Sequence, residues 1–339
     1  PISLAAPRYG EATLGEAPLD WNTDRFFYER RGLYAQDQIG VLDDRVQLLL
    51  GARYNVTSTG NKYDTPEVTP PGYRANVDRV VSPRLGLVVK PRGWLSLYGS
   101  YAESYEMNGQ DWIAPTVFVA PTEADQLEAG AKASLLGDRL GVTLAAFRLT
   151  KQGIYGWVDA ATRPSFPIVA WGSAGAWATY QGGTHRSRGV ELDVNGRLWD
   201  ALSVNASASL VDARVVADAA YAAGNRLEGN AREVANLWLN YVVPADGGVA
   251  GARAARLAGL ELGWGVFHRG RFYQTTANDP DNRVAPFRSM DVALGYRFAG
   301  VRARLNVTNV TNAIGYTSSF GVYEPLWTRR ALLSLSTAF

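Results

Sequence analysis

The chain has 339 residues, with 34 basic and 32 acidic side chains, and this near balance gives no electrostatic case for a nucleic-acid partner. It contains no cysteine and only two histidines, His185 and His268, which excludes a disulfide framework, thiol chemistry and a histidine-rich metal site. No run approaches the roughly 18 apolar residues of a transmembrane helix, and the length suits one large all-β domain or two smaller ones.

Apolar and polar residues alternate with a period of two along most of the chain, which predicts β-strands. We count about thirteen such segments, many of them longer than the roughly 5–6 residues typical of soluble strands, and no segment between them predicts a helix. The clearest are RVQLLLGARYNVT (45–57), QLEAGAKAS (126–134), GVELDVNGRL (189–198), LSVNASASL (202–210) and DVALGYRFAGVRARLNV (291–307).

The connections between these segments alternate between short and long. Short ones lie near residues 43–44, 91–93, 137–138, 199–200 and 299–300, and the longer segment 244–256 belongs to the same side. Long ones cover roughly 58–77, 106–122, 155–185, 213–227, 273–286 and 315–322. Strict alternation puts all short turns at one end, which is the pattern of a transmembrane antiparallel β-barrel with short periplasmic turns and long outer loops.

The composition of the two faces supports lipid on the apolar side. The polar face carries Arg, Asp, Glu, Asn, Ser and many Gly, which suits a hydrated lumen, and aromatic residues lie beside short turns as an interfacial girdle requires: Trp94, Trp199, Tyr296 and Phe298. We predict an outward direction for Val292, Leu294, Val301, Leu305, Leu333 and Leu335. We predict the concave side for Asp291, Arg297, Arg302, Arg304, Glu191 and Asp193. The alternative is a soluble β-sandwich or propeller, although no fixed propeller-like repeat is visible.

The chain ends in the alternating segment RRALLSLSTAF, with Leu333, Leu335 and a terminal Phe339. An amphipathic last strand that stops at an aromatic residue resembles the signal by which outer-membrane barrels are handed to their assembly machinery. The alternative is an ordinary final strand that happens to end in Phe.

Five longer segments follow one another in a recognisable order: GLYAQDQIGVLDDRVQLLLGARY (32–54), SPRLGLVVKPRGWLSLYGSYAESY (82–105), EAGAKASLLGDRLGVTLAAFRLTKQGI (128–154), SRGVELDVNGRL (187–198) and LNVTNVTNAIGY (305–316). Taken together and in this order, they resemble the corresponding segments of TonB-dependent siderophore receptors. The resemblance implies a barrel of about 22 strands preceded by a plug and a TonB-contacting segment, for which this sequence has no counterpart. We therefore expect residues 1–339 to be a partial barrel domain without a plug. Residues 1–25 would be an outer loop, and residues 26–339 would supply about thirteen strands, ending in the closing strand.

The two ends of such a partial sheet raise the question of closure. Closing it would pair the strand near residues 32–40 with the strand near residues 331–339 in a new register, and an odd strand count would make that pair parallel. We therefore expect an open, curved sheet.

The resemblance also implies a function. It implies an outer-membrane receptor that takes up a ferric siderophore and is energised through TonB when intact, with iron present only as the siderophore-bound ligand and no resident cofactor. The implied partners are the ferric siderophore, the TonB complex through the missing N-terminal part, the barrel assembly machinery and outer-membrane lipid, with no nucleic acid.

Aromatic residues of the long connections are the candidate ligand-binding residues, because flat catecholates and apolar chelate shells stack on rings. They are Trp112, Tyr155, Trp157, Trp171, Trp177, Tyr180, Tyr316, Tyr323 and Trp327. The alternative is that these rings form an outer girdle or pack the loops. His185 and His268 are interpreted as barrel or loop residues, because a siderophore already saturates its iron.

Other functions remain as alternatives. They are a general porin, an autotransporter translocator, and a TonB-dependent receptor for haem, cobalamin or an oligosaccharide. An autotransporter would place a helix before the barrel, and none is seen. An enzyme is not expected, because neither histidine accompanies a nucleophile motif and the acidic pairs Glu103/Glu106 and Asp279/Asp281 fit ordinary loop or rim charges.

Overall fold

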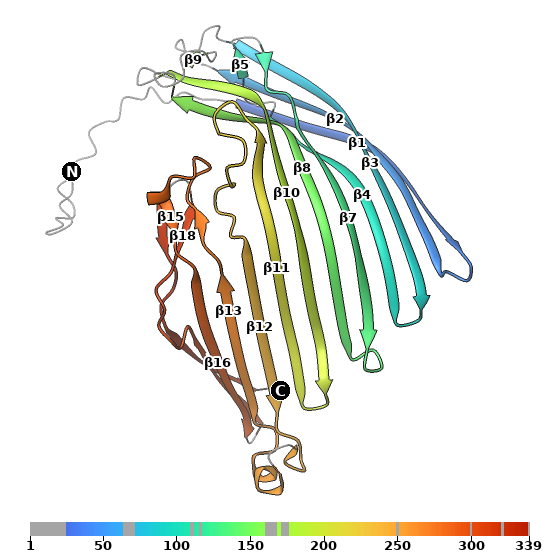
Figure 1. Ribbon diagram of the computed structural model, residues 1–339, viewed down its shortest axis with the longest axis vertical. Helices are drawn as coiled ribbons and strands as arrows, with labels where there is room; N and C mark the ends of the chain where they lie inside the picture. Colours follow the sequence, from blue (N-terminus) through green and yellow to red (C-terminus); the bar gives the residue numbers. More distant parts are fainter. Residues whose placement is uncertain are drawn as a thin grey trace, which may run out of the picture.

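The computed structural model describes residues 25–63, 72–108, 112–114, 117–159, 168–170, 176–248, 251–298, 300–319 and 322–337. Within them, thirteen strands follow one another in one antiparallel, curved sheet (Figure 1). The strands are β1 (Arg25–Val41), β2 (Val46–Tyr63), β3 (Gly72–Arg92), β4 (Leu95–Glu106), β7 (Thr122–Leu135), β8 (Leu140–Asp159), β10 (Ala176–Trp199), β11 (Leu202–Ala217), β12 (Glu233–Val242), β13 (Glu261–Arg269), β16 (Phe287–Phe298), β17 (Val301–Thr308) and β20 (Arg330–Thr337).

Shorter elements occupy the connections. The hairpins β5 (Trp112–Ala114) with β6 (Val117–Phe118), β14 (Phe272–Tyr273) with β15 (Arg283–Val284), and β18 (Tyr316–Ser319) with β19 (Val322–Pro325) pair only within themselves, whereas β9 (Ile168–Ala170) pairs with β10. The described residues also include the 3₁₀ helices η2 (Ala252–Leu257) and η3 (Pro280–Asn282). In the described part of the chain, no helix has the length and apolar character needed to cross a membrane.

The predicted alternation of short and long connections is confirmed. Turns at 42–45, 93–94, 136–139 and 200–201 lie at the lower end of the sheet in Figure 1, and the long connections lie at the upper end. The tight β1–β2 turn places Asp43 and Asp44 at φ angles of 53° and 60°, a region that Asp tolerates better than most residues. The β16–β17 turn uses Gly300 at φ 80°.

The face assignment is also confirmed. Leu294 lies directly opposite Leu305, which lies directly opposite Leu333, so the three share one face. Their side chains are 47%, 38% and 63% exposed, as lipid-facing residues are in an isolated chain and soluble-core residues are not. Apolar residues of all thirteen strands extend this surface, which we call the outer face, although those of β12 are partly buried and Asp37 interrupts it on β1.

The opposite, inner face carries the predicted charges. Glu261 accepts hydrogen bonds from Arg302 at 2.6 Å and from Arg304 at 3.2 Å, which brings β13 and β17 together across β16. Arg297 lies directly opposite Arg302 and therefore shares its face. Asp291 accepts from the backbone N–H of Asn309 at 2.7 Å, and Glu191 and Asp193 alternate with the exposed Val190 and Leu192.

Many glycines of the sheet lie beneath aromatic rings of the paired strand. A Cβ at Gly130 would lie 2.7 Å from the ring of Tyr98, and one at Gly265 would lie 2.5 Å from the ring of Trp238. Each ring residue is the register partner of its glycine. The glycine content of the inner face therefore has a steric reason, because a side chain at these positions would displace the ring that covers the backbone.

The open sheet predicted from the strand count is confirmed. β1 and β20 are the two ends of the strand order, and among the described residues no ladder joins them. The strands near the first and last predicted segments therefore each keep one free edge.

Several predicted boundaries are wrong. The expected loop 58–77 is largely strand, because β2 continues to Tyr63 and β3 begins at Gly72. The expected loop 155–185 is also shortened, since β8 continues to Asp159 and β10 begins at Ala176. Above the apolar part of the outer face, apolar and polar residues no longer alternate regularly, so the pattern that marks a strand disappears although the hydrogen-bond ladder continues. The predicted outer loop 1–25 lies outside the described residues except for Arg25, where β1 begins.

Candidate functional site

A pocket of about 320 Å³ lies at the upper ends of the central strands. Its lining comes from β4, β7, β8 and β10 and from the connections beside them: Glu106, Asn108, Thr122, Leu149, Lys151, Ile154, Tyr155, His185, Ser187 and Leu227. Lys151 and His185 are register partners, and His185 lies on the same face of β10 as the inner-face residues Glu191 and Asp193. The pocket therefore opens on the inner face, on the side of the long connections.

One ion pair and one histidine–carboxylate contact define the polar groups of this pocket. Lys151 Nζ lies 3.0 Å from Glu106 Oε2, and both side chains remain largely exposed. His185 Nε2 lies 3.2 Å from Asp218 Oδ2, whose side chain is fully buried. Asp218 also accepts from the backbone N–H of Ala220 at 2.8 Å, so its orientation is fixed from two sides. The pocket thus offers one exposed cation and one imidazole held in place by a buried carboxylate.

The amide of Gln181 ties the wall of the pocket together. Gln181 pairs with Tyr155 just before an irregularity in the β8–β10 register, which leaves Gly182 and Gly153 without register partners, and its side chain bonds to backbone groups beside that irregularity. Its Nε2 donates to the carbonyls of Ala120 at 2.8 Å and Gly153 at 3.0 Å, and its Oε1 accepts from the N–H of Ala120 at 3.0 Å. Asn108 adds bonds to the Ala120 carbonyl and to Thr122 Oγ1. The segment next to the pocket is therefore fixed by side-chain amides instead of by a ladder.

The predicted aromatic residues separate into groups. Tyr155 lines the pocket, whereas Tyr180 is only 6% exposed and its ring lies against its register partner Gly156. Trp157 and Trp177 lie on the paired upper parts of β8 and β10, and Trp112 lies on β5 opposite Phe118. The side chains of these three tryptophans, and the whole of Trp171, lie outside the described residues.

The remaining candidates form a separate group on the last connection. The rings of Tyr316 and Tyr323 pack edge to face across the β18–β19 hairpin, with centroids 6.5 Å apart. Trp327 is 77% exposed, and the guanidinium of Arg330 lies 4.8 Å from its ring centroid. None of these three residues lines the pocket beside β8 and β10, so the structure does not gather the predicted set at one place.

Sequence reasoning missed the polar residues of the site. Lys151, Gln181 and Asp218 were not singled out, and His185 was interpreted only as a barrel or loop residue. The parity of Lys151 in its strand already indicated an inward direction. The pairing of His185 with Asp218, 33 positions away, has no signal in the local pattern.

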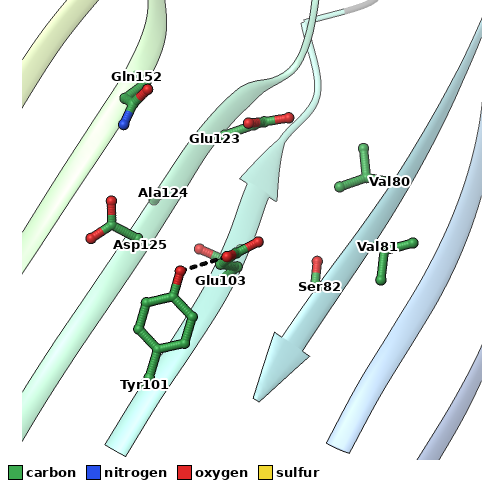
Figure 2. A pocket seen from close by; sticks show the side chains of 10 residues that line it. Val80, Val81, Ser82, Tyr101, Glu103, Glu123, Ala124, Asp125 and Gln152 are labelled. Carbon is green, nitrogen blue, oxygen red and sulfur yellow. Dashed lines mark hydrogen bonds between the residues drawn. The ribbon is translucent and has the colours of Figure 1, made fainter. Parts of the chain in front are cut away.

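The acidic pairs fit the interpretation as ordinary charges. Asp279 caps η3 by accepting from the N–H of Asp281 at 3.0 Å, and Glu106 pairs with Lys151. Glu103 accepts from the hydroxyl of Tyr101 and, with Glu123 and Asp125, lines a second pocket of about 250 Å³ (Figure 2). That pocket forms where β3 and β4 stop pairing above Arg84 and Ala102.

Comparison with known proteins places these features in a family. The family model for the β-barrel of TonB dependent receptor-like proteins matches residues 5–310. The ferrichrome outer membrane transporter/phage receptor of Escherichia coli K12 is 28% identical over 88% of this chain and 36% of its own length. The metal-pseudopaline receptor CntO of Pseudomonas aeruginosa is 26% identical over 96% of this chain and 42% of its own length.

A solved structure shows the same fold. The siderophore receptor PiuA from Acinetobacter baumannii superposes with a TM-score of 0.75 and 20% identity, covering 92% of this chain and 43% of that one. The chain therefore spans less than half the length of the proteins it matches. The family match over most of the chain, the thirteen-strand sheet and the lipid-facing band together show that the chain belongs to the TonB-dependent receptor family, as part of its outer-membrane β-barrel.

Proposed function

We propose that the chain forms part of a receptor that takes up a ferric siderophore across the outer membrane and is energised through TonB. The family membership supports the class of transporter, and the relative that binds ferrichrome supports an iron chelate as its ligand. The barrel assembly machinery and outer-membrane lipid are the further partners of this proposal, and Leu333, Leu335 and Phe339 would form the assembly signal.

The inner-face pocket beside β8 and β10 is the observation that carries the choice of ligand. Tyr155 supplies a ring, and Lys151 supplies a cation whose carboxylate partner is exposed. The aromatic ring of Tyr155 favours a chelate with a flat or apolar outer shell, and the flexible cation of Lys151 favours a chelate with negative charge. In this proposal the iron arrives already saturated by its chelator. The protein therefore needs no resident cofactor and performs no covalent chemistry.

Chelate binding to the full-length receptor tests the proposal. Lys151→Gln and Tyr155→Ala together should weaken binding of ferrichrome roughly 30-fold, since ring stacking and a charge-assisted contact are each worth on the order of 1 kcal/mol. Quenching of tryptophan fluorescence on titration gives the affinity. Lys132→Gln is the matched control, because Lys132 lies on the inner face of β7 but outside the pocket. Equal affinities in the double variant and the parent would remove this pocket from the binding site.

A second candidate ligand is a metal chelate that does not carry iron. The relative that receives metal-pseudopaline aligns with 96% of this chain, and its name specifies no iron. Titrating the same receptor with the zinc and nickel complexes of a pseudopaline-type chelator, beside ferrichrome, separates the two. Haem, cobalamin and an oligosaccharide belong in the same panel, and tighter binding of any of them would reassign the ligand.

A further inference from the structure

Above the apolar band, the outer face of β8, β10 and β11 carries a compact group of arginines. Arg148 is the register partner of Arg188, which is the partner of Asp212. One rung higher, Arg186 is the partner of Arg214. An isolated bridge then pairs Arg214 with Arg226 from the following connection. Register partners share a face, so all five guanidinium groups leave the sheet on its outer side. We call Arg148, Arg186, Arg188, Arg214 and Arg226 the outer arginine cluster.

The height of the cluster follows from strand geometry. On β11 the outer positions are apolar from Leu202 to Leu210, and Asp212 is the first charged one. The ten steps from Leu202 to Asp212 rise about 33 Å along the strand, or about 25 Å along the membrane normal at a tilt of about 40°. This is about the height of the apolar band of an outer-membrane barrel. The arginines therefore begin where the lipid tails end and the outer headgroups start.

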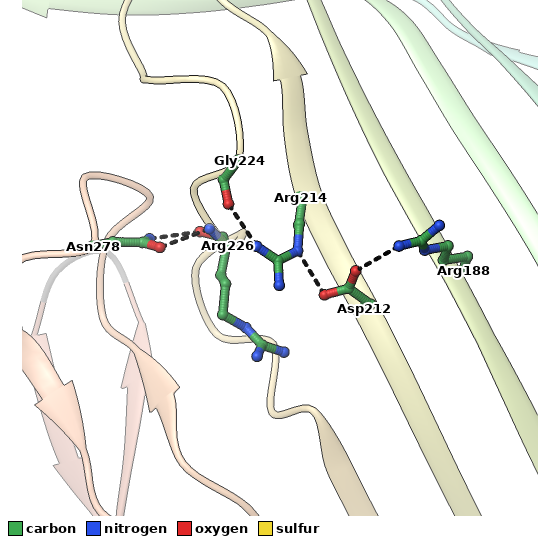
Figure 3. A network of polar contacts seen from close by, with 6 residues as sticks. All are labelled: Arg188, Asp212, Arg214, Gly224, Arg226 and Asn278. Atoms are coloured by element: carbon green, nitrogen blue, oxygen red, sulfur yellow. Dashed lines mark hydrogen bonds and ion pairs between the residues drawn. The ribbon is translucent and has the colours of Figure 1, made fainter.

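The protein itself balances only part of the charge of the cluster, and Figure 3 shows Asp212 between Arg214 and Arg188. Asp212 is the carboxylate within it, accepting from Arg214 Nε at 2.7 Å and, more distantly, from Arg188 at 3.5 Å. No ion pair is formed by Arg148 or Arg186 with the part of the chain that the structure describes. Like charges on directly paired positions destabilise a sheet, so five arginines around one carboxylate leave a strong demand for anions.

The arginine cluster is also held in place. Arg214 donates to the carbonyl of Gly224 at 3.0 Å, and the backbone of Arg226 exchanges two 2.7 Å hydrogen bonds with the side chain of Asn278. Figure 3 shows these contacts joining β11, its following connection and the loop that carries Asn278. The neighbouring outer positions on either side carry the opposite charge, with Asp125 on β7 and Glu233 on β12. The positive surface is therefore a bounded patch and not a continuous ring.

We propose that the outer arginine cluster is a binding site for the phosphate groups of a glycolipid in the outer leaflet. Guanidinium groups bind phosphate oxygens through paired, charge-assisted hydrogen bonds. The exposed Arg148, Arg186 and Arg188 supply these donors, while Arg214 and Arg226 fix the shape of the site. A lipid fits better than a soluble anion because the apolar surface directly below accepts its acyl chains.

Lipid binding to the full-length receptor tests this inference. The receptor is purified free of lipid, and native mass spectrometry then measures retention of lipid A with two phosphates, of the same lipid A after dephosphorylation, and of inorganic phosphate. Each arginine near an anionic headgroup contributes a factor of about five, so Arg148→Gln, Arg186→Gln and Arg188→Gln together should weaken lipid A binding on the order of 100-fold. Dephosphorylated lipid should bind to the parent as weakly as lipid A binds to the variant.

The matched control is Arg79→Gln with Arg288→Gln. These arginines occupy outer-face positions on β3 and β16, outside the cluster, and their loss should change lipid A retention less than twofold. Heat-modifiable migration on gels verifies that every variant is folded. Equal retention of lipid A by the triple variant and the parent, or equal retention of the dephosphorylated lipid, would overturn the proposal. Inorganic phosphate binding as tightly as lipid A would overturn it too, since the occupant would then be a free anion.

Discussion

Glu261 shows how a single inner-face residue organises three strands. Its carboxylate receives hydrogen bonds from Arg302 and Arg304, and Arg302 in turn lies directly opposite Arg297. Its side chain is 21% exposed, so the pairs are partly shielded from water and stronger than surface ion pairs. Without this carboxylate, three arginines would share a small area of the wall.

Glu261→Gln should lower the free energy of unfolding of the full-length receptor by about 1–2 kcal/mol, because hydrogen bonds to charged groups contribute roughly that much. Urea titration in lipid bilayers, followed by tryptophan fluorescence, gives the midpoint. The control is Glu191→Gln, an inner-face carboxylate that forms no ion pair with the described residues. A loss of the same size in both variants would mean that the Glu261 pairs do not stabilise the wall.

At the scale of residues, the sequence predicts the face toward which a side chain points much better than it predicts the residues that the side chain contacts. Parity predicted the faces of Leu294, Arg302 and Glu191, because a strand leaves only two directions for a side chain. It could not predict that Tyr180 packs on Gly156 while Tyr155 lines the pocket, since the register irregularity between Gln181 and Gly183 decides this. The roles of Trp112, Trp157, Trp171 and Trp177 in ligand binding stay predictions.

The outer and inner faces of the strands differ in the side chains that they tolerate. Leu192 lies in the middle of the apolar outer run of β10, and Ser209 lies on the inner face of β11, directly opposite Glu191. The two positions are close in the sheet and meet different solvents. A cation should therefore be costly at the first and acceptable at the second.

Leu192→Arg should destabilise the barrel by about 2–4 kcal/mol, the cost of an arginine near the bilayer midplane. Ser209→Arg should change stability by less than about 0.5 kcal/mol, because the new guanidinium meets water and the carboxylate of Glu191. Folding yield and urea midpoint in bilayers of fixed composition measure both. Similar losses for the two variants would contradict the assignment of the faces.

For the strands, the sequence predicts which segments form them and in what order they pair. It does not predict where the strands end on the side of the long connections. Between Leu202 and Leu210 the outer residues are apolar because lipid demands it, and the alternation is clear. Beyond that level water lies on both sides, so β2, β8 and β10 continue without an apolar face to mark them. The ladder is then held by backbone hydrogen bonds, which leave no trace in side-chain chemistry.

For the whole molecule, the open sheet sets a limit on what this chain does alone. The described strands leave one edge of β1 and one edge of β20 without a partner strand. In a bilayer each unsatisfied backbone group costs several kcal/mol, so spanning sheets close into barrels. The strand count and the short–long alternation predicted this arrangement, because antiparallel hairpins admit one order and thirteen strands do not close antiparallel.

The 339-residue chain, refolded alone into liposomes, should therefore give no chelate-specific uptake. Ferrichrome accumulation inside the liposomes is the measurement, and the full-length receptor reconstituted with its energising partner is the positive control. Leakage of small ions without chelate selectivity agrees with an open sheet. Saturable, chelate-specific uptake by the chain alone would contradict both the open sheet and the need for TonB.

The extension of β8 and β10 beyond the level of Lys151 has a consequence for how new ligand preferences arise. Pocket residues that stand on a hydrogen-bonded wall keep their backbone when a neighbour is exchanged. Evolution can therefore test one side chain at a time at Leu149, Lys151 and Ser187 without losing the scaffold. A laboratory library confined to these inward rungs would sample new chelate specificities among variants that still assemble, whereas insertions in the connections would mostly sample new loop conformations.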